Sequence, residues 1–404
     1  MTVSRRSMLK MAAGASMMPW APGLNVAFAA DTEGQRNILV YIFLRFGMDG
    51  LMLLGPADSG DYQAKRGAIG LQTTGINRGR NIGALDGVPM FLHPDAEQLR
   101  LMFNAKQVAF IHAAGNPTAL RSHFEVQEMV DKGAVDGEIL SNTGWLTRHL
   151  NSRTGPASEF LATADSLIGT TPLRGTAGIV PTTELEALQY YLDNERSDLM
   201  RVLNKGNTPS ELSVRKTLQM ADVVKSKLAA LPRTENPNYT YGSVSQALQP
   251  LARALKLNIG LEVATVDVGG WDHHDNIRNN FSNSIEELSN AIFAFTDDLG
   301  PELMKRVTIV AQTEFGRRVE QNANMGTDHG AASVMIAAGA GITGGKIYGQ
   351  WPGLKDKDLD GGDLVVTTDS RQVIAEVLTK RMGQEKTANV FPQLAYKPLG
   401  LVTV

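Results

Sequence analysis

The chain has 404 residues, a formal net charge of −3 and no cysteine. That length is enough to bury a large core, either as one α/β domain with an insertion or as two or three domains. The mildly acidic balance, with no cluster of lysine and arginine, gives no support to nucleic-acid binding. Without cysteine there are no disulfides and no thiolate ligands, so a metal site in this chain has to use Asp, Glu and His.

The first 29 residues have the features of an export signal. Two adjacent arginines, Arg5 and Arg6, precede a small and apolar stretch that ends in Ala27-Phe28-Ala29. This order is typical of a twin-arginine signal peptide. A basic amphipathic helix or a membrane anchor is the alternative, but prolines and glycines interrupt the stretch. We therefore predict that the twin-arginine export machinery carries the folded protein to the periplasm or beyond, with the signal 1–29 removed and no membrane span in residues 30–404.

Five apolar runs after the signal have the length of strands. They cover residues 37–44, 108–112, 263–268, 307–312 and 334–338. Such continuous runs are typical of strands that are buried on both faces. Residues 282–299 instead repeat their apolar positions at the three-four spacing of an amphipathic helix. The alternation of strands with helices predicts an α/β fold with a mostly parallel, doubly wound sheet.

Two regions interrupt this alternation. Residues 151–258 contain helix-like stretches at 184–203, 210–231 and 243–257, joined by segments rich in Pro and Asn. We interpret 151–258 as a largely helical insertion that covers part of the sheet, within a single domain at 30–404. Residues 58–88 are rich in Gly and Arg, and they predict a long loop with little regular structure.

Three polar clusters in the last third of the chain each follow an apolar run, at 269–276, 313–318 and 326–330. Sites in doubly wound sheets form at the carboxyl ends of the strands, so these clusters are expected to converge. A divalent metal ion, whether zinc, calcium, manganese or magnesium, is the expected ligand, because the clusters supply carboxylates and imidazoles. The candidate metal ligands are Asp272, His274, Glu314, Asp328 and His329, together with Asp49 after the first strand.

Asp272, His274, Glu314 and Asp49 also have structural interpretations. Asp272 and His274 are two residues apart and point the same way in extended backbone, but a surface Asx-turn explains them as well. Glu314 can form a salt bridge with Arg317 instead of binding a metal. Asp49 lies between two glycines, which bring backbone close to a ligand but serve a tight turn equally well.

Ser122 is the candidate nucleophile, because it stands at the start of a predicted helix. Ser122 and Glu125 also have the spacing of a capping box, which explains the pair without any chemistry. A helix N-terminus nevertheless favours an oxyanion or a phosphate beside that serine. His123 is a candidate base or metal ligand. The candidates for neutralising an anionic substrate are Arg121, Arg317 and Arg318.

One glycine motif is set aside. Gly339, Gly341 and Gly344 satisfy the spacing G-x-G-x-x-G after a strand. The dinucleotide-binding fingerprint requires a helix directly after the glycines, whereas residues 345–351 have a further glycine and a β-like pattern. We therefore do not predict nucleotide binding.

Almost the whole chain after the signal resembles the uncharacterised bacterial family catalogued as domain of unknown function 1501. The motifs that carry the resemblance lie at residues 43–50, 121–124, 269–274, 313–317, 326–330 and 348–353. That family is usually grouped with the alkaline phosphatase and sulfatase superfamily. The resemblance therefore implies an alkaline phosphatase-like core that binds one or two metal ions.

The superfamily resemblance also implies roles for single residues. Asp49 would be the first-strand ligand and Ser122 the nucleophile. The remaining ligands would be Asp272 with His274, Glu314, and Asp328 with His329. The sequence departs from the superfamily pattern, because Asp-x-x-x-His is Asp-x-His here and Glu314 stands where an adjacent Asp-His pair is common. One metal site is therefore expected to be altered or lost.

Two functions are compatible with these residues. The first is an exported, metal-dependent hydrolase of phosphate or sulfate esters that acts on an anionic small molecule or a glycan ester. In this function Ser122 attacks phosphorus or sulfur, and Arg121 or Arg317 holds the remaining oxygens. The alternative is a non-catalytic envelope protein with the same fold, which binds a metal or a partner. The altered ligand pattern and the capping-box interpretation of Ser122 favour that alternative.

Overall fold

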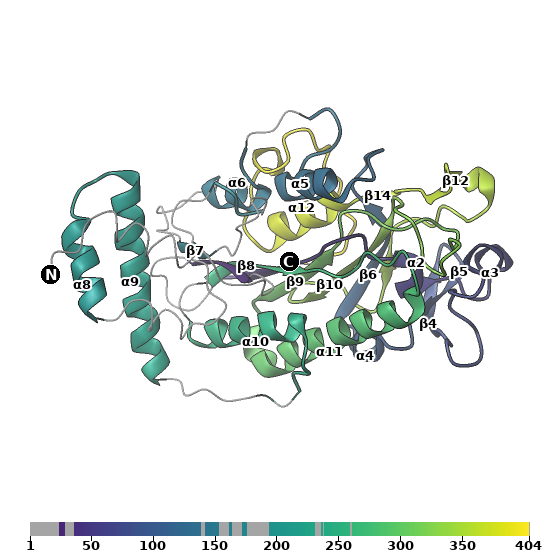
Figure 1. The fold of residues 1–404 in the computed structure, drawn as a ribbon, viewed down its shortest axis with the longest axis horizontal. Helices are drawn as coiled ribbons and strands as arrows, with labels where there is room; N and C mark the ends of the chain where they lie inside the picture. The colour runs from purple at the N-terminus through teal and green to yellow at the C-terminus, as the bar shows by residue number, and fades with distance from the viewer. Residues whose placement is uncertain are drawn as a thin grey trace.

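A computed structural model describes residues 24–28, 36–138, 142–152, 161–163, 172–175, 194–230, 236, 238–258 and 261–403. The protein is an α/β protein with a mixed central sheet and helices on both faces of it (Figure 1). The twin-arginine motif and the predicted cleavage site at Ala29 lie outside the described residues.

The strands of the central sheet are β1 (Leu24–Phe28), β2 (Ile38–Leu44), β6 (Val108–Gly115), β7 (Leu161–Thr163), β8 (Leu261–Val268), β9 (Val307–Gln312), β10 (Ser333–Gly339), β11 (Ile347–Tyr348) and β14 (Thr368–Asp369). Their order is β11-β6-β10-β9-β2-β8-β1-β7, and β14 pairs with β6. Smaller sheets consist of β3 (Leu54–Gly55), β5 (Val88–Leu92) and β4 (Arg80–Leu85), and of β12 (Leu359–Asp360) and β13 (Asp363–Leu364). The five predicted strands are confirmed as β2, β6, β8, β9 and β10.

The α-helices are α2 (Gly50–Leu53), α3 (Gly60–Arg66), α4 (Glu97–Asn104), α5 (His123–Lys132), α6 (Trp145–Asn151), α8 (Asn194–Leu203), α9 (Pro209–Ala230), α10 (Ser243–Lys256), α11 (Ile277–Met304) and α12 (Ser370–Lys380). Two short 3₁₀-helices, η1 (Asp356–Asp358) and η2 (Thr387–Asn389), lie near the C-terminus. The helix predicted at 282–299 is therefore part of the longer α11, which has a kink at Gly300, where φ is 68°.

The directions of the strands bring several loops to one edge of the sheet. β8 and β9 both pair in parallel with β2, whereas β10 pairs antiparallel with β9 and with β6. The prediction of a mostly parallel sheet is thus wrong, because β9 returns to β10 without the helical crossover that a parallel neighbour needs. As a result, β2, β6, β8 and β9 end at the same edge at which β10 begins.

The central strands bury both of their faces. Along β2, Ile38, Val40 and Ile42 belong to one apolar cluster, and the alternate residues belong to a second cluster on the other face. α4, α10 and α11 cover the first face, and α5, α6 and α12 cover the second (Figure 1). Full burial of each such side chain contributes about 1.5–3 kcal/mol. These two layers hold the strand ends in place.

The middle of the chain is helical where it is described. α8 and α9 pack against each other at one end of the molecule, where α9 contacts β7 (Figure 1). α10 packs against α11 and β8 instead, and it therefore covers one face of the sheet. The predicted helix 184–203 is described only from Asn194, and residues 176–193 lie outside the described residues.

The expectation of a long irregular loop at 58–88 is wrong. Ser59 caps α3 by accepting a hydrogen bond from the backbone N–H of Tyr62, and α3 ends at Gly67, where φ is 50°. β4 and β5 form a hairpin whose turn residues Asp86 and Gly87 both have positive φ angles of 50° and 81°. Asp-Gly is a strong hairpin signal, and here it outweighs the low strand propensity of the surrounding glycines.

β1 falls inside the predicted signal segment. It pairs antiparallel with β8 and with β7. Cleavage after Ala29 would therefore remove this strand from its place between β8 and β7. None of the helices in the described ranges is both long and apolar enough to span a membrane.

The buried His112 in β6 predicts an acid-sensitive fold. Its Nε2 donates to the carbonyl of Leu54 at 2.8 Å, and burial lowers the pKa of His112 to about 4 despite that hydrogen bond. In the unfolded chain the His112 side chain has its ordinary pKa near 6.5, so it binds a proton at a higher pH than it does in the folded protein. The neutral His112 therefore contributes about 3 kcal/mol of stability above pH 6.5, and this contribution is lost as the pH falls towards 4.

We expect the unfolding free energy, measured by urea titration from pH 7 to pH 4, to fall less steeply with pH in His112→Gln than in the unchanged protein. The difference in slope should correspond to about one proton. Equal slopes for the variant and the unchanged protein would contradict this assignment.

Candidate metal centre

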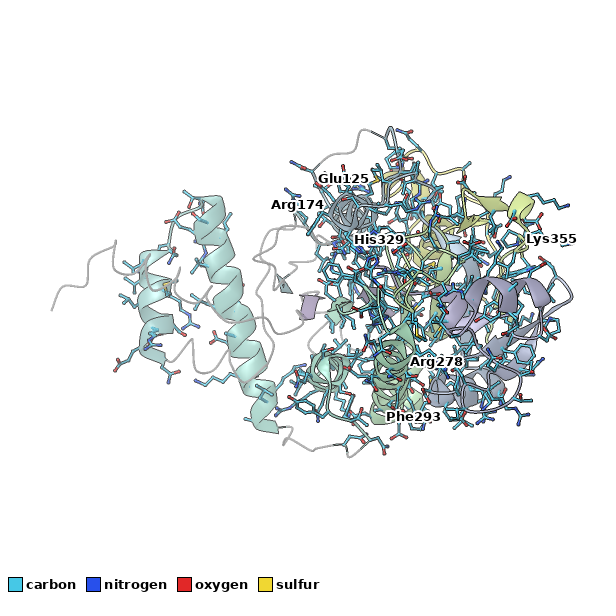
Figure 2. All side chains as sticks on the ribbon, turned by 45° about the vertical axis from the view of Figure 1, so that its right-hand side comes forward. Glu125, Arg174, Arg278, Phe293, His329 and Lys355 are labelled. Atoms are coloured by element: carbon cyan, nitrogen blue, oxygen red, sulfur yellow. The ribbon has the colours of Figure 1, made fainter. Side chains whose placement is uncertain are left out.

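Three side chains meet at the shared edge of the sheet. His123 is the first residue of α5, Asp272 follows β8, and His329 precedes β10. The Nε2 atoms of His123 and His329 each lie 3.3 Å from Asp272 Oδ1. The ligand atoms of the three residues lie within 4.8 Å of one another, so this group can hold a metal ion. Figure 2 shows His329 within the main body of the molecule, beneath Glu125 of α5.

The two imidazoles are oriented by hydrogen bonds on their far side. Nδ1 of His123 lies 2.8 Å from Glu314 Oε1, and Nδ1 of His329 lies 2.8 Å from the carbonyl of Arg121. A carboxylate and a carbonyl only accept, so Nδ1 carries the proton and Nε2 presents its lone pair to the group. Metal-binding histidines commonly have such a partner.

Three further observations suit metal binding by these imidazoles. Nε2 of His123 is buried and makes no hydrogen bond with the described residues. Burial lowers the pKa of His329, which keeps its imidazole neutral at neutral pH. The stacking of His123 on Phe315, with ring centroids 4.8 Å apart, fixes the plane of the ring.

His274 extends the group on its solvent side. Its Nε2 lies 2.9 Å from His329 Nε2 and 3.0 Å from Asp272 Oδ1. Its Nδ1 lies 3.1 Å from Asp328 Oδ1, and Asp328 also accepts a hydrogen bond from Asn322. Asp328 therefore contacts the Nδ1 atom of His274, just as Glu314 contacts the Nδ1 atom of His123. Asp328 is not part of the three-residue group.

Glu314 lies behind His123, away from Asp272. It is fully buried, and it accepts hydrogen bonds from His123, from Gln127 and from the backbone N–H of Phe46. Burial raises the pKa of Glu314, but the hydrogen bonds from His123 and Gln127 outweigh it, so the pKa is lowered. Glu314 is thus an ionised residue that orients the candidate ligand His123.

Arg317 holds Asp272 in place. Its guanidinium donates to Asp272 Oδ1 at 2.6 Å and to the carbonyls of Phe46, Gly47, Trp271 and Thr327. Burial raises the pKa of Asp272, but the hydrogen bond and the charge of Arg317 outweigh it and lower the pKa to about 2. Asp272 is therefore ionised, and the donors of Arg317 are used within the protein.

The structure does not bring Asp49 to the group. Asp49 caps α2 through the backbone N–H of Met52, and it pairs with the buried Arg66 at 2.6 Å and 3.0 Å. The hydroxyl of Thr327 donates to it as well, at 3.1 Å. Both carboxylate oxygens therefore already have partners.

Ser122 and Arg121 lie next to His123 in the chain. Ser122 is the N-cap residue of α5, but its side chain makes no capping hydrogen bond, so the predicted capping box is not formed. The guanidinium of Arg121 donates to Asp363 Oδ2 at 2.6 Å and 2.9 Å, and its carbonyl faces His329. Arg318 lies 3.5 Å from the other oxygen of Asp363.

Sequence reasoning missed Gln127, and it named His123 as a candidate base or metal ligand without placing it among the six candidate metal ligands. A helical spacing of four places His123 and Gln127 on one face of α5, and both contact Glu314. That spacing was readable in the sequence, but it has meaning only once Glu314 is known to lie opposite.

The chain belongs to a family of proteins without an assigned function. Residues 112–388 match the family described as Protein of unknown function (DUF1501), which confirms the family resemblance predicted from the motifs. The matched residues include His123, Asp272 and His329, whereas Asp49 lies before them. No curated protein matches the sequence.

Proposed function

We propose that the protein is a metal-dependent hydrolase of phosphate or sulfate esters. The observation that carries this proposal is the pair of imidazoles, His123 and His329, that present Nε2 to Asp272 while their Nδ1 atoms are held from behind. Two histidines and one carboxylate form a common ligand set of hydrolytic zinc. Ligands rich in imidazole favour zinc over calcium or magnesium.

The residues around the centre have separate tasks in this proposal. A bound divalent ion would polarise the ester and ease deprotonation of a nearby hydroxyl. Ser122, next to His123, is the proposed nucleophile. Its Oγ forms a bond to phosphorus or sulfur, the bond to the ester oxygen breaks, and the alcohol leaves with a proton. Water then hydrolyses the covalent serine ester and restores Ser122. The N-terminus of α5 favours the negative charge that develops beside Ser122.

The alkaline phosphatase-like, doubly wound core is part of the same proposal. Helices on both faces of the sheet and ligand-bearing loops at one edge support it. Glu314 replaces the expected Asp-His pair and contacts His123, which supports a single metal ion in place of two. Export of the folded protein by the twin-arginine route, to the periplasm or outside the cell, would let it acquire that ion before export.

The test starts from the purified mature protein. We expect one equivalent of bound metal, turnover of aryl phosphate or aryl sulfate esters, and loss of that turnover with a chelator until zinc or manganese is restored. Ser122→Ala should abolish turnover while metal content and stability are retained. Absence of bound metal together with absence of metal-dependent turnover would overturn the proposal. Full turnover by Ser122→Ala would indicate that a metal-bound water, and not Ser122, is the nucleophile.

One observation favours a non-catalytic metal-binding protein as the second candidate. Both Arg121 and Arg317, which were expected to hold ester oxygens, donate to carboxylates and carbonyls of the protein itself. One bound metal ion without turnover of any ester in the screen would support this candidate.

A further inference from the structure

A groove of about 340 Å³ opens at the start of α11. Small-ligand pockets commonly have volumes of about 300–1,000 Å³. Its polar lining comes from Asn77, Asp95, Asn276, Arg278, Asn279 and Ser282. Pro94 and two exposed apolar side chains, Ile76 and Met325, complete it. Figure 2 shows Arg278 below His329 on the same body of the protein.

Most of these polar groups are available to a ligand. The side chains of Asn276, Arg278, Asn279 and Ser282 make no hydrogen bond or ion pair with any other described residue. Arg278 and Ser282 are four residues apart, so they lie on one face of α11. The first turns of a helix also leave backbone N–H groups without helical partners, and no side chain caps this one.

The lining suits a hydroxyl-rich ligand without a strong net charge. Arg278 and Asp95 are the ionisable residues of the lining, and their charges cancel. The amide and hydroxyl groups of Asn276, Asn279 and Ser282 offer both donors and acceptors, and an alcohol likewise both donates and accepts. A sugar ring matches this mixture, because its hydroxyls bond to both kinds of group and its C–H faces contact apolar side chains such as Met325.

Two segments connect the groove to the metal centre. His274 belongs to the centre and Asn276 to the groove, and residues two apart have Cα atoms at most about 7 Å apart. The second segment contributes Met325 to the groove and His329 to the centre, and Asn322 in the same loop donates to Asp328 and to the carbonyl of His274. A ligand in the groove would therefore lie next to the reacting group.

We propose that this groove binds a sugar ring of a glycan, and that it holds the glycan part of the ester that the metal centre hydrolyses. Only the second half of this proposal rests on the proposed function. Binding of an uncharged sugar needs no metal ion, so the two parts can be tested separately.

The experiment uses mature protein treated with a chelator and saturation-transfer difference NMR with methyl glucoside, methyl galactoside, N-acetylglucosamine and maltose. We expect at least one sugar to bind. Arg278→Ala and Asp95→Ala should each weaken that binding about tenfold, or about 1.4 kcal/mol, because each change removes a hydrogen bond between the sugar and a charged group. Asn283→Ala is the matched control, since Asn283 is an exposed residue of α11 outside the groove lining, and it should leave binding unchanged.

Absence of binding for all four sugars overturns the proposal, and so does binding that neither Arg278→Ala nor Asp95→Ala weakens. Displacement of the sugar by sodium sulfate at equal concentration would contradict the inference that the groove binds an uncharged ligand. Failure of the ester hydrolase activity with sugar binding retained would sink the proposed function and leave the groove as a sugar-binding site.

Discussion

Replacing His123 with alanine is expected to weaken Zn²⁺ binding by more than about 100-fold. The change removes the buried Nε2 that lies 3.3 Å from Asp272 Oδ1, and with it one of the two imidazoles of the group. Competition with a chromophoric chelator measures the affinity directly. Circular dichroism of the same sample shows whether the fold is kept, so that lost affinity is not confused with unfolding.

Glu314→Gln separates positioning from direct ligation. Within the three-residue group, Glu314 contacts only His123, at the Nδ1 atom that faces away from Asp272. We therefore expect Glu314→Gln to lower the Zn²⁺ affinity by about 10–100-fold, a smaller loss than that for His123→Ala. His273→Asn is the matched control, because His273 is a buried neighbour of Asp272 and His274 that is not part of the three-residue group. Equal losses for Glu314→Gln and His123→Ala would assign Glu314 to the metal itself, and a large loss for His273→Asn would contradict the geometry.

The strands and the convergence of their loops could be predicted, whereas the direction of one strand could not. A short continuous apolar run that is rich in β-branched and aromatic residues, such as that at β2, favours a buried strand over a helix. The reversed direction of β10 depends on how the chain returns from β9, and the hydrophobic pattern of a buried strand is the same in both directions. Asp328 and His329 reach the shared edge because β10 begins there.

The partners of the ionisable residues could not be derived from spacing along the chain. Glu314 and Arg317 are three residues apart and suggest a salt bridge, yet Glu314 bonds to His123 and Arg317 to Asp272. Both partners are distant in sequence. Likewise, Ser122 and Glu125 have capping-box spacing, but the box does not form. Long-range contacts decide these side chains, and local patterns contain no information about them.

Asp49 illustrates the same limit and leads to a stability prediction. Its position after the first strand suggests a metal ligand, but the partner it has in the structure is Arg66, in the region expected to be an irregular loop. Both side chains are buried, with relative exposures of 1% and 0%. Removing one member of a buried ion pair leaves an uncompensated charge, which costs about 3–5 kcal/mol.

We therefore expect Arg66→Met to lower the unfolding free energy in urea by about 3–5 kcal/mol. Asp49→Asn should cost less, because the amide oxygen of asparagine can still accept from Met52 and Thr327. The double variant should be more stable than Arg66→Met alone, since no unpaired carboxylate remains buried. Metal content separates the two interpretations of Asp49. If the carboxylate of Asp49 serves only the ion pair, Asp49→Asn should bind one equivalent of zinc and be less stable. Loss of zinc without loss of stability would instead indicate that Asp49 is a metal ligand.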